Sequence, residues 1–243
     1  MKPTRRSLLV SGSQKRISGP KPVPRSLPEL KVKRAAAKRK GTAGNIAQAS
    51  KSEKSRDSIL GAAAKLFRRQ GYSATTLRQI AAMAEIKAGS IYYYFDSKEA
   101  ILDEVLHRGL LSIFEAVKTA LKNAGEVSHR RRIGLAIEAH LVALLEASDF
   151  TSANIRIYGQ LPEHLKQLHR PLRKAYARYW DRLFLDARRA GEIRADIEIV
   201  PLRIFVLGAL NWTVEWFSFS SKDAVLKLAR RTELLIFDGV KKA

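Results

Sequence analysis

The sequence predicts an all-α protein in which a small N-terminal helix-turn-helix domain, residues 51–100, precedes a larger helical bundle, residues 101–243. Apolar residues recur every three to four positions through both regions. Hydroxyl residues and glycines stand where helices should begin and end. No segment shows the strict alternation of apolar and polar residues that is typical of β-strands.

The first 50 residues form a separate basic tail. They contain 13 lysines and arginines against one acid, Glu29, which gives +12 of the chain's net charge of +22. Such a composition, rich in proline, glycine and serine, offers too little apolar surface to fold, so we expect disorder. Two roles stay open: a solvated tail, or an arm that adds sequence-neutral, salt-dependent affinity for DNA.

Two targeting signals are conceivable for this tail. The pair Arg5-Arg6 is similar to a twin-arginine export signal, but only the short apolar run 8–10 follows it. Because an export signal needs a longer apolar stretch, we do not expect export. An organellar transit peptide is the less favoured alternative, and a cytoplasmic, nucleoid-associated protein is the main expectation.

The first helix of the N-terminal domain is predicted to end at Gly71. One of its faces is apolar, and the basic residues Arg68 and Arg69 occupy its last turn before the glycine. The second helix should begin at Thr76, because Thr76 and Gln79 have the spacing of a capping box. Its buried side should consist of four apolar residues: Leu77, Ile80, Ala81 and Ala84.

The third helix is short and carries three tyrosines. Ile91 and Phe95 are four residues apart and should face the core, which turns Ser90, Tyr92 and Tyr93 outward. Asp96 and Glu99 form a second cap-like pair that should open a fourth helix. Three short helices with a tight turn between the second and third are the geometry that places a helix in the major groove of DNA.

Residues 59–106 as a whole closely resemble the N-terminal domain of the TetR family of one-component regulators. The resemblance rests on short motifs spread over nearly fifty residues without a gap: Leu66-Phe67, Gly71-Tyr72, Thr75-Thr76, Ile80-Ala81, Gly89-Ser90-Ile91-Tyr92, Phe95 and Ser97-Lys98-Glu99. It implies a homodimer that binds double-stranded DNA at a palindromic operator and that a small molecule releases. It further implies that Thr76, Ser90, Tyr92, Tyr93 and Lys98 hold phosphates. Arg78, Lys87 and Gly89 would then lie at or near base edges, with Arg78 suited to bidentate contact with guanine.

Two departures from the family pattern affect the turn. Glu85 stands where a glycine is usual, so the turn must form without the residue that adopts a left-handed conformation most easily. Lys87 and Ala88 replace the usual serine and basic residue, which removes a hydroxyl cap from the recognition helix.

The C-terminal region reads as a ligand-binding and dimerisation bundle. Helices are predicted over residues 133–145, 171–190, 201–217 and 225–240. Residues 201–217 are apolar on almost all sides, as in a helix buried in a bundle and a dimer interface. We expect the interface to consist of residues 171–190 and 201–217.

The segments 150–156 and 208–217, together with Trp180, look like the branch of the family that controls sterol and lipid catabolism and responds to acyl-CoA thioesters. On that resemblance Arg156 and Arg173 would bind the phosphates of CoA, and Trp180 or Trp212 would stack on a ring system. The alternatives are a solvated face for the arginines, core packing for the tryptophans, and a different hydrophobic ligand.

Several functions are not expected. The chain has no cysteine, no HExxH spacing among its five histidines, and no Walker A or GxSxG sequence, so we expect neither an enzyme nor a metal site nor a cofactor. It lacks a run of 18 apolar residues, so we expect no membrane partner. The rival hypotheses are a sequence-neutral basic DNA-associated protein and a TetR-like activator.

Overall fold

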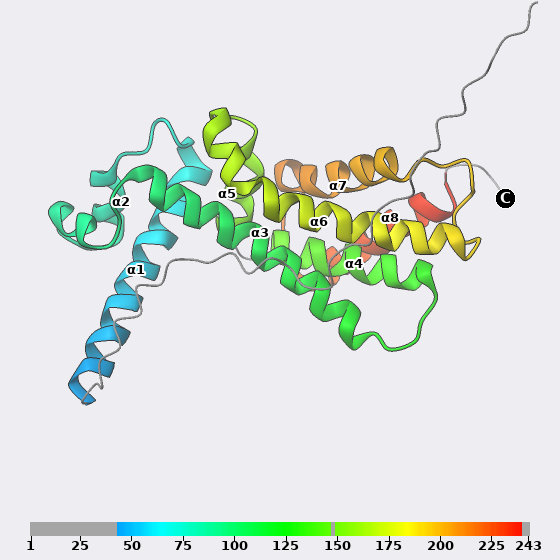
Figure 1. Ribbon diagram of the computed structural model, residues 1–243, viewed down its shortest axis with the longest axis horizontal. Helices are drawn as coiled ribbons and strands as arrows, with labels where there is room; N and C mark the ends of the chain where they lie inside the picture. The colour runs from blue at the N-terminus through cyan, green and yellow to red at the C-terminus, as the bar shows by residue number, and fades with distance from the viewer. Residues whose placement is uncertain (1–42, 147–148, 240–243) are drawn as a thin grey trace, which may run out of the picture. The chain divides into compact units, whose positions relative to one another are not determined.

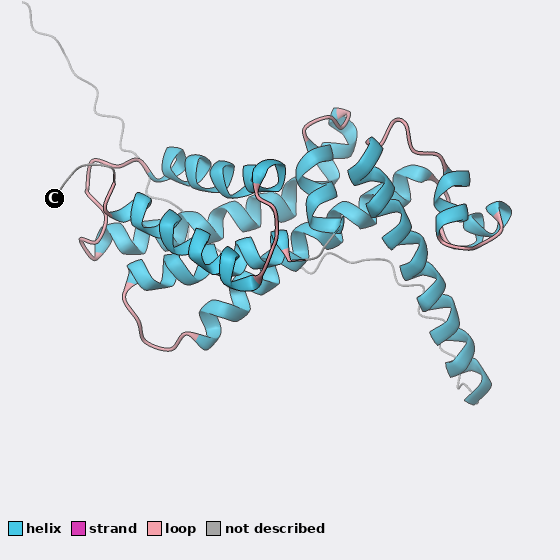
Figure 2. Cartoon of the chain, turned by 180° about the vertical axis from the view of Figure 1, so that it is seen from behind, coloured by secondary structure: helices cyan, strands magenta, loops and turns pink. Residues whose placement is uncertain are grey.

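The computed structural model describes residues 43–146 and 149–239, and within this part every regular element is a helix (Figure 1, Figure 2). The predicted all-α fold is confirmed. Residues 1–42 of the predicted disordered tail lie outside the described residues, whereas its last part, residues 43–50, is not disordered but belongs to helix α1. The elements are α1 (Ala43–Gln70), α2 (Leu77–Met83), the 3-10 helix η1 (Ala88–Tyr93), α3 (Lys98–Asn123), α4 (His129–Leu145), α5 (Asp149–Tyr158), α6 (Glu163–Arg189), α7 (Ile199–Trp216) and α8 (Lys222–Phe237).

The first apolar core joins the N-terminal helices to α5. Ile59, Phe67, Ile80 and Ile91 are buried there, as the sequence predicted, together with Leu102 from α3. The same cluster also contains residues from α5, the segment after it and the start of α6: Ala153, Ile157, Leu161 and Leu165. The DNA-binding module is therefore completed by residues far beyond position 100.

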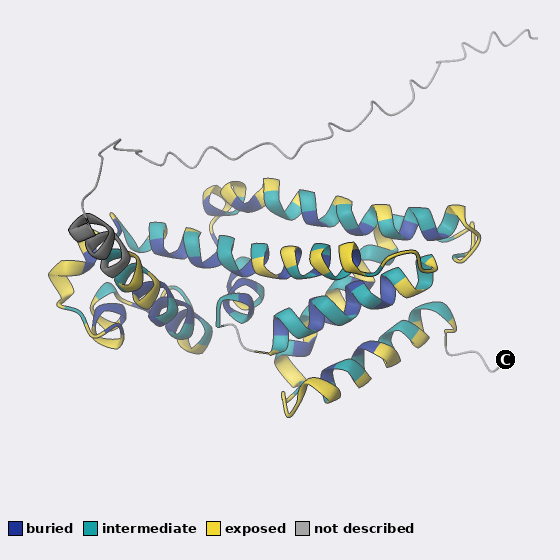
Figure 3. Cartoon of the chain, turned by 90° about the horizontal axis from the view of Figure 1, so that it is seen from below, coloured by how far each residue is buried: buried dark blue, intermediate teal, exposed yellow. Residues whose placement is uncertain are grey.

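The second apolar core lies among α3, α4, α6, α7 and α8. Its largest buried side chains, Trp180 and Phe184, come from α6, and Ile113 and Ile133 come from α3 and α4. Buried positions form bands on the helix faces that look toward neighbouring helices (Figure 3). One continuous helix, α3, contributes to both cores and runs across position 100, where the sequence suggests a domain boundary.

The helices predicted from residues 133, 201 and 225 begin two to four residues earlier, at His129, Ile199 and Lys222, and two other helix starts differ for a specific reason. Ser97 caps α3 by accepting a hydrogen bond from the Ala100 amide, so Asp96 is not the cap. Helix α6 begins at Glu163 and not at Pro171, which lies inside it. A proline has no amide hydrogen to donate to the carbonyl four residues before it, so α6 gives up one helical hydrogen bond at Pro171 and continues past it.

Candidate DNA-binding and ligand-binding sites

The capping box at the start of α2 fixes the geometry of the helix-turn-helix. The Thr76 hydroxyl accepts a hydrogen bond from the Gln79 amide at 3.2 Å, and the Thr76 amide donates to Gln79 Oε1 at 2.9 Å. Both bonds satisfy groups that a helix end leaves unpaired. Thr76 therefore sets where α2 begins, and the predicted capping box is present.

The turn after α2 is made by Glu85 in a left-handed conformation. Its φ is +57°, and it is the one residue other than glycine with a positive φ in the part of the chain that the structure describes. The Ile86 amide then reaches back to the Ala81 carbonyl at 3.0 Å, which closes the turn. A side chain in this conformation costs about 1–2 kcal/mol relative to glycine, so the departure noted in the sequence is a local strain.

The recognition element is a single 3-10 turn, η1, which presents polar and aromatic groups to solvent. Ile91 and Phe95 are buried beneath it, as predicted, whereas Tyr92 is 61% and Tyr93 80% exposed. Gly89, Ser90 and Lys87 are exposed beside them, and Arg78 is exposed on α2. The structure thus places the predicted base-contacting and phosphate-contacting residues, except Lys98 of α3, on the solvent-facing side of α2 and η1. Their individual roles toward DNA stay predictions.

Lys98 has a structural role at the start of α3. Its ammonium donates to the carbonyls of Tyr72 at 3.0 Å and Thr75 at 2.8 Å, and it lies 4.2 Å from the centre of the Tyr72 ring. The Tyr72 hydroxyl donates to Glu99 Oε1 at 2.7 Å, and this bond holds the pKa of Glu99 below its usual value. Lys98 has one proton left for the phosphate that the resemblance assigns to it.

A cavity of about 400 Å³ lies among α3, α4, α5, α6 and α7. Leu110 and Ile113 line it from α3, and its polar group is centred on the buried His140. The Tyr176 hydroxyl lies 2.7 Å from His140 Nδ1, and Asn211 Oδ1 lies 3.2 Å from Nε2. An amide oxygen can only accept, so Nε2 carries the proton and Nδ1 accepts from Tyr176. Burial lowers the pKa of His140 to about 4 and keeps the imidazole neutral.

Arg173 extends from α6 into the wall of this cavity. One guanidinium nitrogen donates to Asn154 Oδ1 at 2.5 Å, and the group lies 3.3 Å from the centre of the Tyr158 ring. Its Nε is buried and has no hydrogen-bond partner. Burial lowers the pKa of Arg173 to about 10, which still leaves it charged at neutral pH. A buried N–H without an acceptor is costly, so the position of this guanidinium carries an energetic cost.

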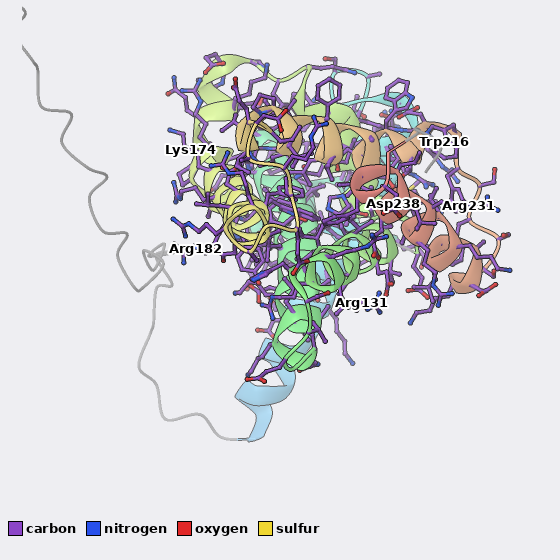
Figure 4. The ribbon with its side chains drawn as sticks, turned by 90° about the vertical axis from the view of Figure 1, so that its right-hand side faces the viewer. Arg131, Lys174, Arg182, Trp216, Arg231 and Asp238 are labelled. Carbon is purple, nitrogen blue, oxygen red and sulfur yellow. The ribbon has the colours of Figure 1, made fainter. Side chains whose placement is uncertain are left out.

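Three further cations line the cavity: Arg170, Lys174 and Arg203. Arg170 is paired with Glu163, and Arg203 Nε lies 2.6 Å from Asp181. Lys174 points away from the bundle on the outer side of α6 (Figure 4). The cavity therefore combines apolar walls, a neutral polar group and the charged Arg173, with three further basic side chains at its edge, two of them paired with carboxylates.

Comparisons with known proteins agree with both sites. Residues 59–105 match the family described as bacterial regulatory proteins of the tetR family, and residues 126–240 match the tetracyclin repressor-like C-terminal domain. The chain belongs to the TetR family of transcriptional regulators. This membership confirms the predictions of a DNA-binding regulator and of a protein that is not an enzyme.

The relatives that match this TetR-family regulator align with most of the residues that the structure describes. The HTH-type transcriptional repressor KstR2 of Rhodococcus jostii RHA1 is 28% identical over 190 residues, which are 76% of this chain and 90% of KstR2. The structure of PfmR from Thermus thermophilus aligns with a TM-score of 0.67 at 25% identity, over 76% of this chain and 99% of PfmR. AibR in complex with isovaleryl coenzyme A and operator DNA shares the fold, with a TM-score of 0.67 at 19% identity, over 75% of this chain and 98% of AibR.

The four residues predicted to bind an effector do not come together. Arg173 lines the cavity, but Arg156 is exposed and pairs with Glu215 at 2.8 Å. Trp180 is fully buried and packs edge-on against Tyr176, and Trp212 is 65% exposed on α7. Sequence reasoning missed His140, Tyr176, Asn154 and Asn211. Asn211 had a usable signal, since it is a polar residue in the largely apolar run 204–214; Asn154 had none, because α5 carries several other polar residues.

Helix α7 of this regulator presents an apolar stripe to solvent. Ile204, Phe205, Trp212 and Trp216 are each more than half exposed, and the small residues 208–209 lie between them. Leu234 and Leu235 of α8 are also exposed, and α8, which leads to the label C in Figure 3, shows little buried surface. The apolar stripe of α6 packs in the chain's own core, and most of the exposed apolar residues of the bundle lie on α7 and α8; the interface on residues 171–190 and 201–217 stays a prediction.

By length and composition α7 is also the one helix in the described ranges that could cross a membrane. It carries Arg203 and Glu215, both of which form ion pairs with other helices of the bundle. Members of the TetR family bind operator DNA as dimers. An exposed apolar patch of this kind is typical of a protein–protein interface.

Proposed function

We propose that this protein is a transcriptional repressor that binds a palindromic operator as a homodimer and leaves it when an acyl-CoA enters the cavity around His140. The observation that carries the proposal is the cavity itself. It joins apolar walls to a rim of arginine and lysine, and an acyl-CoA joins an apolar acyl group to phosphates. We further propose that the protein acts in the cytoplasm, associated with the nucleoid.

The cavity suits the two ends of such a ligand in different ways. Leu110, Ile113 and Leu207 give an acyl chain apolar contacts, and the neutral His140 adds no buried charge. At about 400 Å³ it holds the acyl end, which leaves the nucleotide end at the rim near Arg170 and Lys174. Arginine pairs well with phosphate because its N–H groups form a fixed fork. The complex of AibR with isovaleryl coenzyme A and operator DNA supports this ligand class on the same fold.

The exposed stripe on α7, together with Leu234 and Leu235 of α8, is proposed as the dimer interface. Two copies would bring four helices together, with Gly208 and Ala209 allowing a close approach of the two α7 helices. To read the two half-sites of a palindrome, such a dimer must hold its recognition elements one helical turn of DNA apart, about 34 Å.

The test is a thermal melt with isovaleryl-, octanoyl- and oleoyl-CoA, each beside its free acid and free CoA. A ligand held at 100 times its Kd should add about 2.7 kcal/mol of stability. A shift with one thioester, but with neither its acid nor CoA, supports the proposal. The same thioester should raise the Kd for an operator selected from a random duplex pool.

Lys174→Ala is the matched site variant and Arg178→Ala the control, since both residues lie on α6 and only Lys174 lines the cavity. We expect the thioester shift to shrink in Lys174→Ala alone. No shift with any thioester refutes acyl-CoA as the ligand. Tighter operator binding with the ligand refutes the repressor, and a preference for the selected site below about 10³ over bulk DNA favours a sequence-neutral DNA-binding protein.

A further inference from the structure

Helix α5 belongs physically to the DNA-binding module. Its buried residues Ala153 and Ile157 lie in the same apolar cluster as Phe67 of α1 and Leu102 of α3. Asp149 at its first turn pairs with Arg68 of α1 at 2.9 Å. A displacement of α5 would therefore also displace the helices that surround α2 and η1.

Helices α5 and α3 touch backbone to backbone at Gly109. A Cβ atom at this position would overlap the Phe150 carbonyl oxygen and would lie 3.2 Å from Asn154 Cβ. Only glycine allows so close an approach without a shift of one helix. The two helices are thus in direct contact beside Asn154.

Asn154 joins this contact to the cavity. It is 2% exposed, and its side-chain amide donates to the Leu106 carbonyl of α3 at 2.5 Å. Its Oδ1 accepts the hydrogen bond from Arg173 of α6 at 2.5 Å. One buried side chain therefore links α3, α5 and α6, and its partner on α6 lines the cavity.

The first turns of α3 hold the rest of the DNA-binding module. Lys98 binds two carbonyls in the segment between α1 and α2. Glu104 pairs with Arg56 of α1, and Arg108 pairs with Asp57 of α1 at 2.7 Å. Any movement of α3 is passed to α1 and to the start of α2 through these bonds.

We propose that the hydrogen bond from Arg173 to Asn154 is the switch through which a ligand in the cavity acts on the DNA-binding module. This inference rests on the proposed function. With the cavity empty, Arg173 holds Asn154, and Asn154 holds α3 in the arrangement that fits the operator. An acceptor oxygen of the ligand competes with Asn154 Oδ1 for the Arg173 guanidinium, which lines the cavity, and draws it from Asn154. The link between α6 and α3 is then lost, and the operator is released.

The test needs no ligand at its first stage, because breaking the bond should mimic the ligand. We expect Asn154→Ala and Arg173→Met each to weaken operator binding by about 10-fold, which is within the usual range of allosteric coupling. The double variant should be no weaker than either single variant, because both remove one interaction. Circular dichroism and a stoichiometric titration of active protein establish that the variants fold.

Two controls separate the switch from the ligand site. Arg178→Met removes an α6 arginine outside the cavity, and Lys174→Met removes a cavity cation that does not contact Asn154. Arg178→Met should keep the wild-type operator affinity and the wild-type thioester binding, and Lys174→Met should bind the thioester more weakly.

The second stage adds octanoyl-CoA to the operator complexes. Wild type should release the operator, and the residual binding of Asn154→Ala and Arg173→Met should change less than about threefold, because the link is already broken in both. Wild-type operator affinity in both single variants, or strictly additive losses in the double variant, would overturn the switch. If no thioester releases wild type but the variants still lose the operator, the proposed ligand is wrong and the Arg173–Asn154 link to the DNA-binding module stands.

Discussion

Lowering the pH from 7.5 to 5.0 should destabilise this protein through His140. The imidazole is fully buried, accepts from Tyr176 and donates to Asn211, and has its pKa lowered from 6.5 to about 4 by burial. Protonation would place a second donor against the Tyr176 hydroxyl and a charge where no carboxylate is hydrogen-bonded to the ring. The folded state therefore binds this proton less readily than the unfolded chain does.

The sign and size of this change in stability follow from the linkage between protonation and folding. Above pH 6.5 both states are neutral and the stability is full; as the pH falls from 6.5 toward 4, the unfolded chain takes up the proton first and stability is lost. With these two pKa values the loss from His140 is about 2 kcal/mol per chain at pH 5, and about 3 kcal/mol below pH 4. His169, whose pKa burial also lowers, contributes in the same direction.

The assay is urea unfolding at fixed protein concentration at pH 7.5 and pH 5.0, for wild type, His140→Gln and His164→Gln. Glutamine can still donate to Asn211 and accept from Tyr176 but does not titrate, so this variant should lose about 2 kcal/mol less than wild type between the two pH values. His164 is exposed on α6, and its variant should behave as wild type does. Equal pH dependence in all three proteins would refute the assignment of a buried neutral His140.

Four further predictions concern the turn, the helix contact, the interface and the tail. Glu85→Gly should raise the free energy of unfolding by about 0.5–1 kcal/mol in urea titrations, whereas Glu85→Ala should not, because only glycine relieves a φ of +57°. Gly109→Ala should lower the melting temperature and weaken operator binding, since its Cβ meets the Phe150 carbonyl. Phe205→Glu, at a residue 79% exposed, should give monomers in sedimentation and leave the far-UV circular dichroism unchanged. Removing residues 1–42 should flatten the dependence of log Kd on log salt while keeping the ratio of operator to non-operator affinity; an unchanged slope would show that the tail stays off the DNA.

The sequence predicted those structural features that depend on residues within one or two helical turns of each other. The capping box of Thr76, the core positions of Ile91 and Phe95, and the strain at Glu85 all follow from local spacing and residue type. The same local logic failed at Pro171, where a good helix start by composition lies inside a longer helix. Local preference is weak, and packing of the α6 stripe against the core overrides it.

The cavity could not be predicted from local sequence patterns, because the residues that line it are far apart in the chain. His140 and Asn211 are 71 residues apart, and Asn154 and Leu106 are 48 apart. Helical periodicity says which face of a helix is apolar, but it does not say which two faces meet. Residue type alone does not distinguish Arg156 from Arg173. In the structure Arg156 pairs with Glu215 at the surface, whereas Arg173 donates a hydrogen bond to the buried Asn154.

The continuity of α3 explains how a change at one hydrogen bond can affect DNA binding. The two family matches, residues 59–105 and 126–240, leave a gap that falls largely within this one unbroken helix, so no flexible linker separates the domains. From Gly109 to Lys98 the helix is about 16 Å long, at about 1.5 Å per residue. A tilt of about 10° around the Gly109 contact would therefore move Lys98 by about 3 Å, and would move the carbonyls of Tyr72 and Thr75 with it. In a dimer both recognition elements move, and their separation must match one turn of DNA, so a shift of this size in each chain is enough to release the operator.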